Sequence, residues 1–265
     1  MISADLQASL RSAVVDAREL RYETLSVEQL LLALLRNPRA ADVLRACAVN
    51  VDELHAKLSA TVRDKTPAVA GTAQVNPQAS LEFQRVIQRA IILVDATRGR
   101  VATSTGIRRA VWRVTSRVLA AFGVFVGQGM VDGADALVAI FGEKESPAVK
   151  ELHRHGATRF AVTSYLAHGV RKSDLPETKT TREELHGDAD VVLFNDNFTP
   201  MEFVVKVLRE HFDLSLDAAV PIMLKIHGEG RAVCGRFVAR VAAEKVELVR
   251  AAARAEEHPL RCVAE

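Results

Sequence analysis

Two stretches of this chain repeat one pattern of apolar residues, and this duplication limits the fold more than any other feature. The run LLALL at 31–35 lines up with LVAIF at 137–141. Once two extra residues are allowed, Leu44 and Leu58 correspond to Leu152 and Leu166. Each unit is too small to bury its own apolar faces, so we expect the two units to pack together as one domain.

The first unit reads as four helices. Apolar residues recur at helical spacing from Leu6 to Ala17. Ser26 followed by Gln29 is a capping-box signature that starts the next helix, and Asn37-Pro38 ends it, because the residue before proline disfavours the α conformation. Further helices of this unit are predicted at 40–46 and 51–62. A connector poor in charge follows at 66–80, and the pattern then starts again with a helix at 83–91.

The second unit is interrupted. Ala17 and Leu25 are 8 residues apart, whereas the corresponding Ala90 and Val131 are 41 apart, which indicates an insertion near 100–129. Between residues 96 and 131 the chain has six arginines, at 98, 100, 108, 109, 113 and 117, and no acidic residue. Such a segment can bind nucleic acid or an anionic membrane surface, but we favour an insertion without a dedicated role.

The chain changes character after a charged, Thr-rich stretch at 173–189, which is a predicted linker. The run VVLF at 191–194 is typical of a strand, and Thr199 to Glu202 combines a capping box with proline at the first helical position. The remaining elements are expected to be a helix at 215–227 ended by Gly228, a strand at 230–237, a helix at 239–253 and a strand at 260–263. The predicted fold class is multidomain: an all-α domain of duplicated four-helix repeats at 1–172, and a small α/β domain of order βααβαβ at 190–265.

The motifs of the small domain resemble those of the ClpS family of N-degron adaptors. The strings that carry the resemblance are NDNFTPMEFVVKVL, IMLKIHGEG, AVCG, VAAEKV and EHPLRC, in the order of the family. Residues 1–172 similarly resemble the N-terminal domain of the ClpA unfoldase, through VEQLLLALLRNP, FQRVIQRA, ALVAIFGEKES and HGVRKS. The chain thus resembles an adaptor fused to the domain on which that adaptor docks.

The residues of the small domain have the chemistry to bind a free amino terminus. An ammonium group donates three hydrogen bonds, and Asn195, Asp196 and a neutral imidazole of His227 supply acceptors. Met223, Ile226 and His227 share one helical face. The resemblance implies a site for N-terminal Leu, Phe, Tyr or Trp, made of Asn195, Asp196, Asn197, Thr199, Pro200, Met201, Val204, Met223, Ile226, His227 and Leu260.

Three positions refine that expectation. Met201 matches the residue that excludes β-branched side chains in the family. Asn197 stands where the family usually has Asp, which removes one acceptor charge, and Ile226 is bulkier than the Val often found there. We therefore expect weaker ammonium binding and a slightly smaller pocket.

The resemblance also implies a docking surface for the unfoldase. Lys245 matches a family docking residue, and Arg240 replaces an acidic residue at a neighbouring position. Glu23 and Glu28 match acidic positions of the unfoldase N-domain and are candidates to pair with Lys245 or Arg240. Whether the halves then touch within one chain or between chains stays open.

Composition excludes several other functions. The net charge of +2 argues against a globally basic nucleic-acid binder, and three scattered cysteines argue against a disulfide scaffold or zinc module and for a reducing compartment. No phosphate-binding Gly-x4-Gly-Lys-Ser/Thr string, metal set or nucleophile–base pair is visible, so we expect neither an enzyme nor a cofactor. No targeting or membrane-spanning segment is apparent, which predicts a cytoplasmic protein without nucleic-acid or membrane partners.

These features favour a non-enzymatic adaptor that binds proteins with bulky apolar N-termini and delivers them to a ClpA-type AAA+ unfoldase of the ClpAP protease. The alternative is a regulatory decoy, in which the helical half occupies the adaptor half through an intramolecular contact and inhibits delivery. A chaperone-like or nucleic-acid-binding role of the arginine-rich insertion is a third interpretation.

Overall fold

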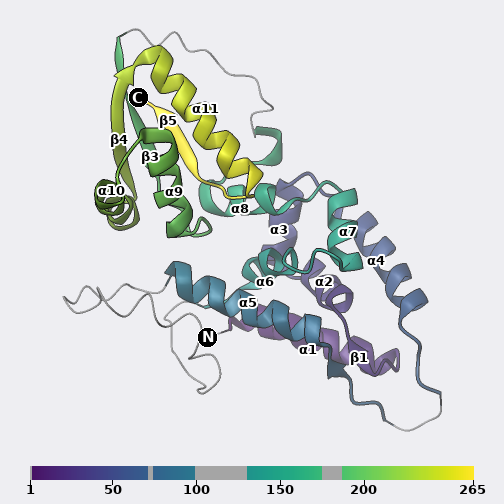
Figure 1. Ribbon diagram of the computed structural model, residues 1–265. Helices are drawn as coiled ribbons and strands as arrows, with labels where there is room; N and C mark the ends of the chain where they lie inside the picture. Colours follow the sequence, from purple (N-terminus) through teal and green to yellow (C-terminus); the bar gives the residue numbers. More distant parts are fainter. Residues whose placement is uncertain (1, 71–73, 99–129, 175–186) are drawn as a thin grey trace, which may run out of the picture.

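The computed structural model describes residues 2–70, 74–98, 130–174 and 187–265, with side chains at 95–98 left undescribed. The expected insertion at 100–129, and most of the expected linker, lie outside the described residues. Figure 1 shows two parts, a helical domain and a smaller α/β domain. Both parts of the predicted fold class are confirmed.

Within the described residues, the helical domain consists of two units of four helices each. The first unit has α1 (Ala4–Glu19), α2 (Val27–Leu35), α3 (Pro38–Ala46) and α4 (Val51–Lys65). The second has α5 (Leu81–Arg98), α6 (Gly133–Ile140), α7 (Pro147–Arg154) and α8 (Arg159–His168). The apolar runs that reveal the duplication form α2 and α6, whose residues are almost all buried, as expected for helices that are apolar on every side.

Both central helices begin in the same way. Ser26 accepts a hydrogen bond from the Gln29 amide, while the Gln29 side chain accepts one from the Ser26 amide at 2.8 Å, so the predicted capping box is confirmed. Asp132 and Asp135 form the equivalent capping box of α6. Asn37 then caps α3, with proline in its first turn.

Short parallel pairings interlock the two units. Strand β1 (Thr24–Leu25) pairs with β2 (Gln78–Ala79), which lies just before α5 and within the stretch expected to be only a connector. The corresponding residue of the second unit, Val131, forms a parallel bridge with Ile2, just before α1. Each unit thus pairs its strand with the segment that leads into the other unit, and residues of both units form one hydrophobic cluster.

The α/β domain has the predicted order βααβαβ. It runs through β3 (Asp188–Phe194), α9 (Met201–Phe212), α10 (Leu216–Glu229), β4 (Arg231–Val238), α11 (Ala239–Ala255) and β5 (Arg261–Ala264). The sheet order is β4-β3-β5 with both pairs antiparallel. The central strand β3 therefore directs the loop that follows Phe194 toward the starts of β4 and β5.

The end of α10 differs from the prediction. Gly228 lies inside the helix, and Gly230 ends it in the left-handed conformation, with φ of 83°. Gly230 donates its backbone amide to the Ile226 carbonyl at 2.9 Å, and its positive φ then turns the chain out of the helix, a conformation that glycine adopts easily. Judged from the sequence, either glycine could end the helix. Only the backbone conformation shows that Gly230 is the residue that does so.

Helix α8 makes two hydrogen bonds between the two domains. Arg159 donates to the Glu257 carbonyl at 2.8 Å, and a ring nitrogen of His168 lies 2.8 Å from the Pro259 carbonyl oxygen. Figure 1 shows α8 beside the segment that joins α11 to β5. Phe198, from the loop after β3, is 7% exposed and belongs to the buried cluster of the helical domain.

No helix within the described ranges is both long and apolar enough to cross a membrane.

Candidate functional site

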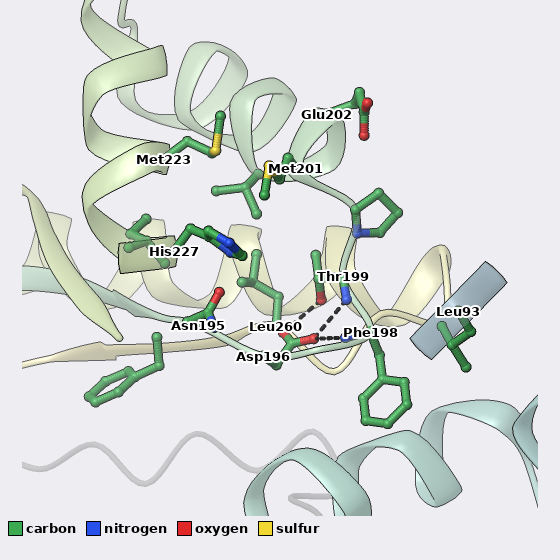
Figure 2. A pocket seen from close by; sticks show the side chains of 14 residues that line it. Leu93, Asn195, Asp196, Phe198, Thr199, Met201, Glu202, Met223, His227 and Leu260 are labelled. Carbon is green, nitrogen blue, oxygen red and sulfur yellow. Dashed lines mark hydrogen bonds between the residues drawn. The ribbon is translucent and has the colours of Figure 1, made fainter. Parts of the chain in front are cut away.

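A mostly apolar hollow of about 310 Å3 opens between the loop after β3, the start of α9 and the last turns of α10. Figure 2 shows the side chains that surround it. The lining residues are Leu93, Phe194, Asn195, Asp196, Phe198, Thr199, Pro200, Met201, Glu202, Val204, Met223, Ile226, His227 and Leu260. The structure therefore brings together every residue predicted for the amino-terminus site except Asn197, which is exposed beside it.

Asp196 organises the loop that forms one wall. Its carboxylate accepts three hydrogen bonds, each of 2.7 Å, from the amides of Phe198 and Thr199 and from the Thr199 hydroxyl. Helix α9 begins at Met201, one residue later than expected, so Thr199 is not its N-cap and the predicted capping box there is wrong. Pro200 is the N-cap instead and makes no side-chain hydrogen bond.

Asn195 and His227 form the polar end of the hollow. The backbone amide of Asn195 donates to the Gly230 carbonyl at 2.8 Å. This bond connects the loop to the end of α10, one turn from His227. Both side chains are half-buried, and Figure 2 shows the His227 ring turned toward Asn195. An amide oxygen beside an imidazole nitrogen can accept two hydrogen bonds from one cation.

Most of the remaining lining is apolar. Val204, Ile226 and Leu260 are 7%, 2% and 5% exposed and belong to the core of the α/β domain, so they form a rigid floor. Met201 and Met223 are half-buried and face each other from α9 and α10 in Figure 2. Two unbranched thioether side chains at an opening can adapt to side chains of different shape.

Comparisons with known proteins match the two domains separately. The family model described as "ATP-dependent Clp protease adaptor protein ClpS" matches residues 186–263, and the "Clp repeat (R) N-terminal domain" matches residues 1–105. A ClpS adapter of Leptothrix cholodnii is 63% identical over 75 residues, which are 28% of this chain and 65% of that protein. The ClpS adapter of Paracidovorax citrulli is 49% identical over 34% of this chain and 73% of its own length, and that of Vibrio atlanticus is 42% identical over 35% and 88%.

The chain belongs to the ClpS adaptor family. The resemblance drawn from the motifs is thereby confirmed, and the matched family is one of adaptors for the ATP-dependent Clp protease.

Two solved structures are also similar. Agrobacterium tumefaciens ClpS2 bound to L-phenylalaninamide is 30% identical, with a TM-score of 0.30, over 31% of this chain and 98% of that one. A malarial protein from a study of a secretion system is 13% identical, with a TM-score of 0.43, over 62% of this chain and 91% of that one.

Four residues of the hollow were missed from the ClpS motifs. Phe194 directly precedes the motif string that begins at Asn195, so extending that string by one position would have found it. Glu202 lies inside the string, next to Met201, but was not assigned to the site. Phe198 is the apolar residue within a polar loop, a pattern that often signals a contact. Leu93 comes from α5, in the other domain, and no local pattern connects it with the ClpS motifs.

The four residues expected at the docking surface make contacts within their own domains. Lys245 donates to the His211 carbonyl at 2.6 Å, and Arg240 lies 3.8 Å from Glu244. Glu28 accepts hydrogen bonds from the Ser146 hydroxyl and the Ala148 amide, so it stabilises the start of α7. Glu23 is exposed beside β1.

The hypothesised pairing of Lys245 or Arg240 with Glu23 or Glu28 is therefore not formed among the described residues. The physical reason is the orientation of the domains, because α8 and the Phe198 loop, rather than the start of α11, face the helical domain.

The three cysteines are free and buried, as expected for small apolar residues. Burial raises the pKa of Cys47 to about 11 and those of Cys234 and Cys262 to about 12. Neutral thiols are poor nucleophiles and poor metal ligands. In the described part of the chain, no group of three His, Cys, Asp or Glu side chains is placed to hold a metal ion.

Proposed function

We propose that this protein binds the free amino terminus of proteins whose first residue is Leu, Phe, Tyr or Trp and delivers them to a ClpA-type unfoldase of the ClpAP protease. The observation that carries the proposal is the pairing of Asn195 and His227 at one end of an apolar hollow. The family to which the chain belongs supports the same function.

The polar end suits an ammonium group. A bound amino terminus loses its water, and acceptors must replace that water. Asn195 and a neutral His227 offer two acceptors, whereas three of the roughly four acceptor positions of the Asp196 carboxylate are already used by Phe198 and Thr199. Asp196 therefore supports the site by shaping the loop, and its negative charge favours a cation nearby.

The apolar part suits one large side chain. Complete burial of a Leu or Phe side chain contributes about 1.5–3 kcal/mol, whereas micromolar affinity requires about 8 kcal/mol. The ammonium and backbone contacts must supply the remainder, so recognition depends on a free amino terminus. Met201 lines the hollow, and the expected exclusion of β-branched residues depends on the match of Met201 to the family motif.

The binding test uses the full chain and peptides that begin with Phe, with L-phenylalaninamide as a minimal probe. We expect N-terminal acetylation to weaken binding by at least about 100-fold, since it removes the charge and two donors. Asn195→Ala and His227→Ala should each weaken binding by about tenfold or more, whereas His211→Gln, outside the hollow, is the matched control. Equal binding of free and acetylated peptides would refute the proposal.

Delivery is favoured over the decoy because the fused domain leaves the expected docking residues uncovered. The Arg240 side chain is 87% exposed, and the contacts of Lys245 lie within the α/β domain. A degradation assay with purified ClpAP and a Leu-initiated reporter separates the alternatives. We expect faster degradation when this protein is added, and slower degradation would instead identify a decoy.

A further inference from the structure

Leu93 is a residue of the helical domain that lines the hollow of the ClpS-like domain. It lies on α5, packed against the core of the helical domain, and it is half-buried. Its neighbour Ile92 is 50% exposed and does not line the hollow. The adaptor site of this chain therefore has one wall that a separate ClpS-like domain does not contain.

The contacts between the domains hold that wall in place. Phe198 belongs to the hydrophobic cluster of the helical domain, while its own loop carries Asn195 and Thr199. Arg159 and His168 make hydrogen bonds to carbonyls on either side of His258, in the segment that leads to Leu260. Both the loop and the floor of the hollow are thus attached to the domain that provides Leu93.

If the proposed function is correct, Leu93 lies where the side chain of the second residue of a bound chain would lie. The first residue would occupy the region near His227, with its side chain between Met201 and Met223. In Figure 2, Leu93 lies on the opposite side of Thr199 from His227, next to Phe198. Adjacent Cα atoms are 3.8 Å apart and successive side chains of an extended chain point in different directions, so a neighbouring residue can contact a different wall.

We propose that Leu93 makes the fused helical domain part of the specificity site, by favouring an apolar second residue in the bound amino terminus. Leu93 and Phe198 line this part of the hollow with apolar surface. An apolar second side chain would cover that surface, whereas a glycine at position two would leave the surface exposed to water. The preference arises from burying that second side chain and adds to the selection of the first residue.

The experiment compares peptides that differ only at position two, beginning Phe-Leu or Phe-Gly, on the full chain. We expect Phe-Leu to bind about fivefold more tightly than Phe-Gly, since a partly buried Leu side chain contributes a fraction of its full transfer free energy. Leu93→Ala should remove most of this difference and leave the affinity for Phe-Gly within about twofold. Ile92→Ala, one residue away and outside the hollow, should preserve the wild-type preference.

Two results would overturn the proposal. In the first, Leu93→Ala keeps the preference for Phe-Leu. In the second, it changes both affinities equally, which would mean that Leu93 covers the hollow rather than selecting a residue. Acetylated versions of both peptides separate this test from the proposed function: if they bind as well as the free peptides, the amino-terminus site itself is refuted, and this inference with it.

Discussion

At the scale of single residues, Asp196 shapes the loop that forms one wall of the hollow. Its residue type makes it a candidate acceptor for an ammonium group. In the folded chain its two oxygens accept three hydrogen bonds from the next turn of the loop. These bonds shape the segment on which Thr199 and Pro200 line the hollow.

Substitutions of Asp196 distinguish loop shaping from direct charge recognition. Asp196→Ala leaves two backbone amides without their acceptor, so we expect a loss of about 1–2 kcal/mol of unfolding free energy and about tenfold weaker binding of a Phe-initiated peptide. Asp196→Asn keeps one acceptor oxygen and should cause less than half of either effect. Chemical denaturation and peptide titration measure both.

If Asp196→Asn weakened binding as much as Asp196→Ala while preserving stability, the carboxylate charge would be the important property. The positioning role would then be wrong, and Asp196 would act on the ammonium directly.

At the scale of elements, helix α10 places His227 in the hollow and depends on where it ends. Gly230 has a positive φ, and its carbonyl accepts a hydrogen bond from the backbone amide of Asn195. The helix end and the loop are therefore joined at this residue. Gly228, two residues earlier, has an ordinary helical conformation. A Cβ atom at either position would meet no atom within 4 Å, so only the backbone conformation separates them.

This pair of glycines predicts opposite effects of one substitution. Gly230→Ala forces a side chain into the left-handed region and should cost about 1–2 kcal/mol. Gly228→Ala removes backbone freedom from the unfolded chain and should stabilise by about 0.5–1 kcal/mol. Thermal or chemical unfolding of the two variants checks the prediction, and it fails if both substitutions change stability in the same direction.

At the scale of the whole molecule, His258 lies where the two domains meet. Its ring packs on Phe203 with centroids 4.5 Å apart, and its side chain is 12% exposed. Burial, and then the positive charge of Arg159 on α8, lower the pKa of His258, while the nearby carboxylates of Glu256, Asp196 and Glu257 act in the opposite direction. The neutral form is therefore the one that the folded chain favours.

The pH dependence of stability follows from that lowered pKa. Below about pH 6.5, the ordinary value for histidine, the unfolded chain binds the proton more readily than the folded chain. The contribution of His258 is complete above that pH and is lost as the pH falls through the lower pKa of the folded chain. We expect the unfolding free energy to decrease between pH 7.5 and pH 5.5, and the decrease to be smaller in His258→Gln.

His155→Gln serves as the matched control, because it removes an imidazole from the helical domain and leaves His258 unchanged. An identical pH dependence in His258→Gln and the unaltered chain would contradict the assignment. Arg159→Gln should also reduce the dependence, since it removes the positive charge that lowers the pKa of His258.

Local interactions made much of this protein predictable. The capping box at Ser26, the order of strands and helices, and the helical face that joins Met223, Ile226 and His227 all depend on residues within a few positions of one another. Short-range hydrogen bonds and side-chain periodicity depend on which residue types stand a few positions apart, so they can be predicted from the sequence. The same locality explains why the ClpS motifs identify nearly the whole lining of the hollow.

The sequence by itself determined two domains, their elements and the chemistry of one site. Only the tertiary structure decided that Thr199 bonds to Asp196, that α10 ends at Gly230, and that Phe198 lies in the core of the helical domain. It also decided that Leu93 reaches the hollow from another domain. The bond of Thr199 to Asp196 and the end of α10 are local features in which the folded backbone selects one of several arrangements that the residue types allow. The contacts of Phe198 and Leu93 with the other domain depend instead on how folded surfaces fit against each other, and that fit results from the packing of many distant residues rather than from any local pattern.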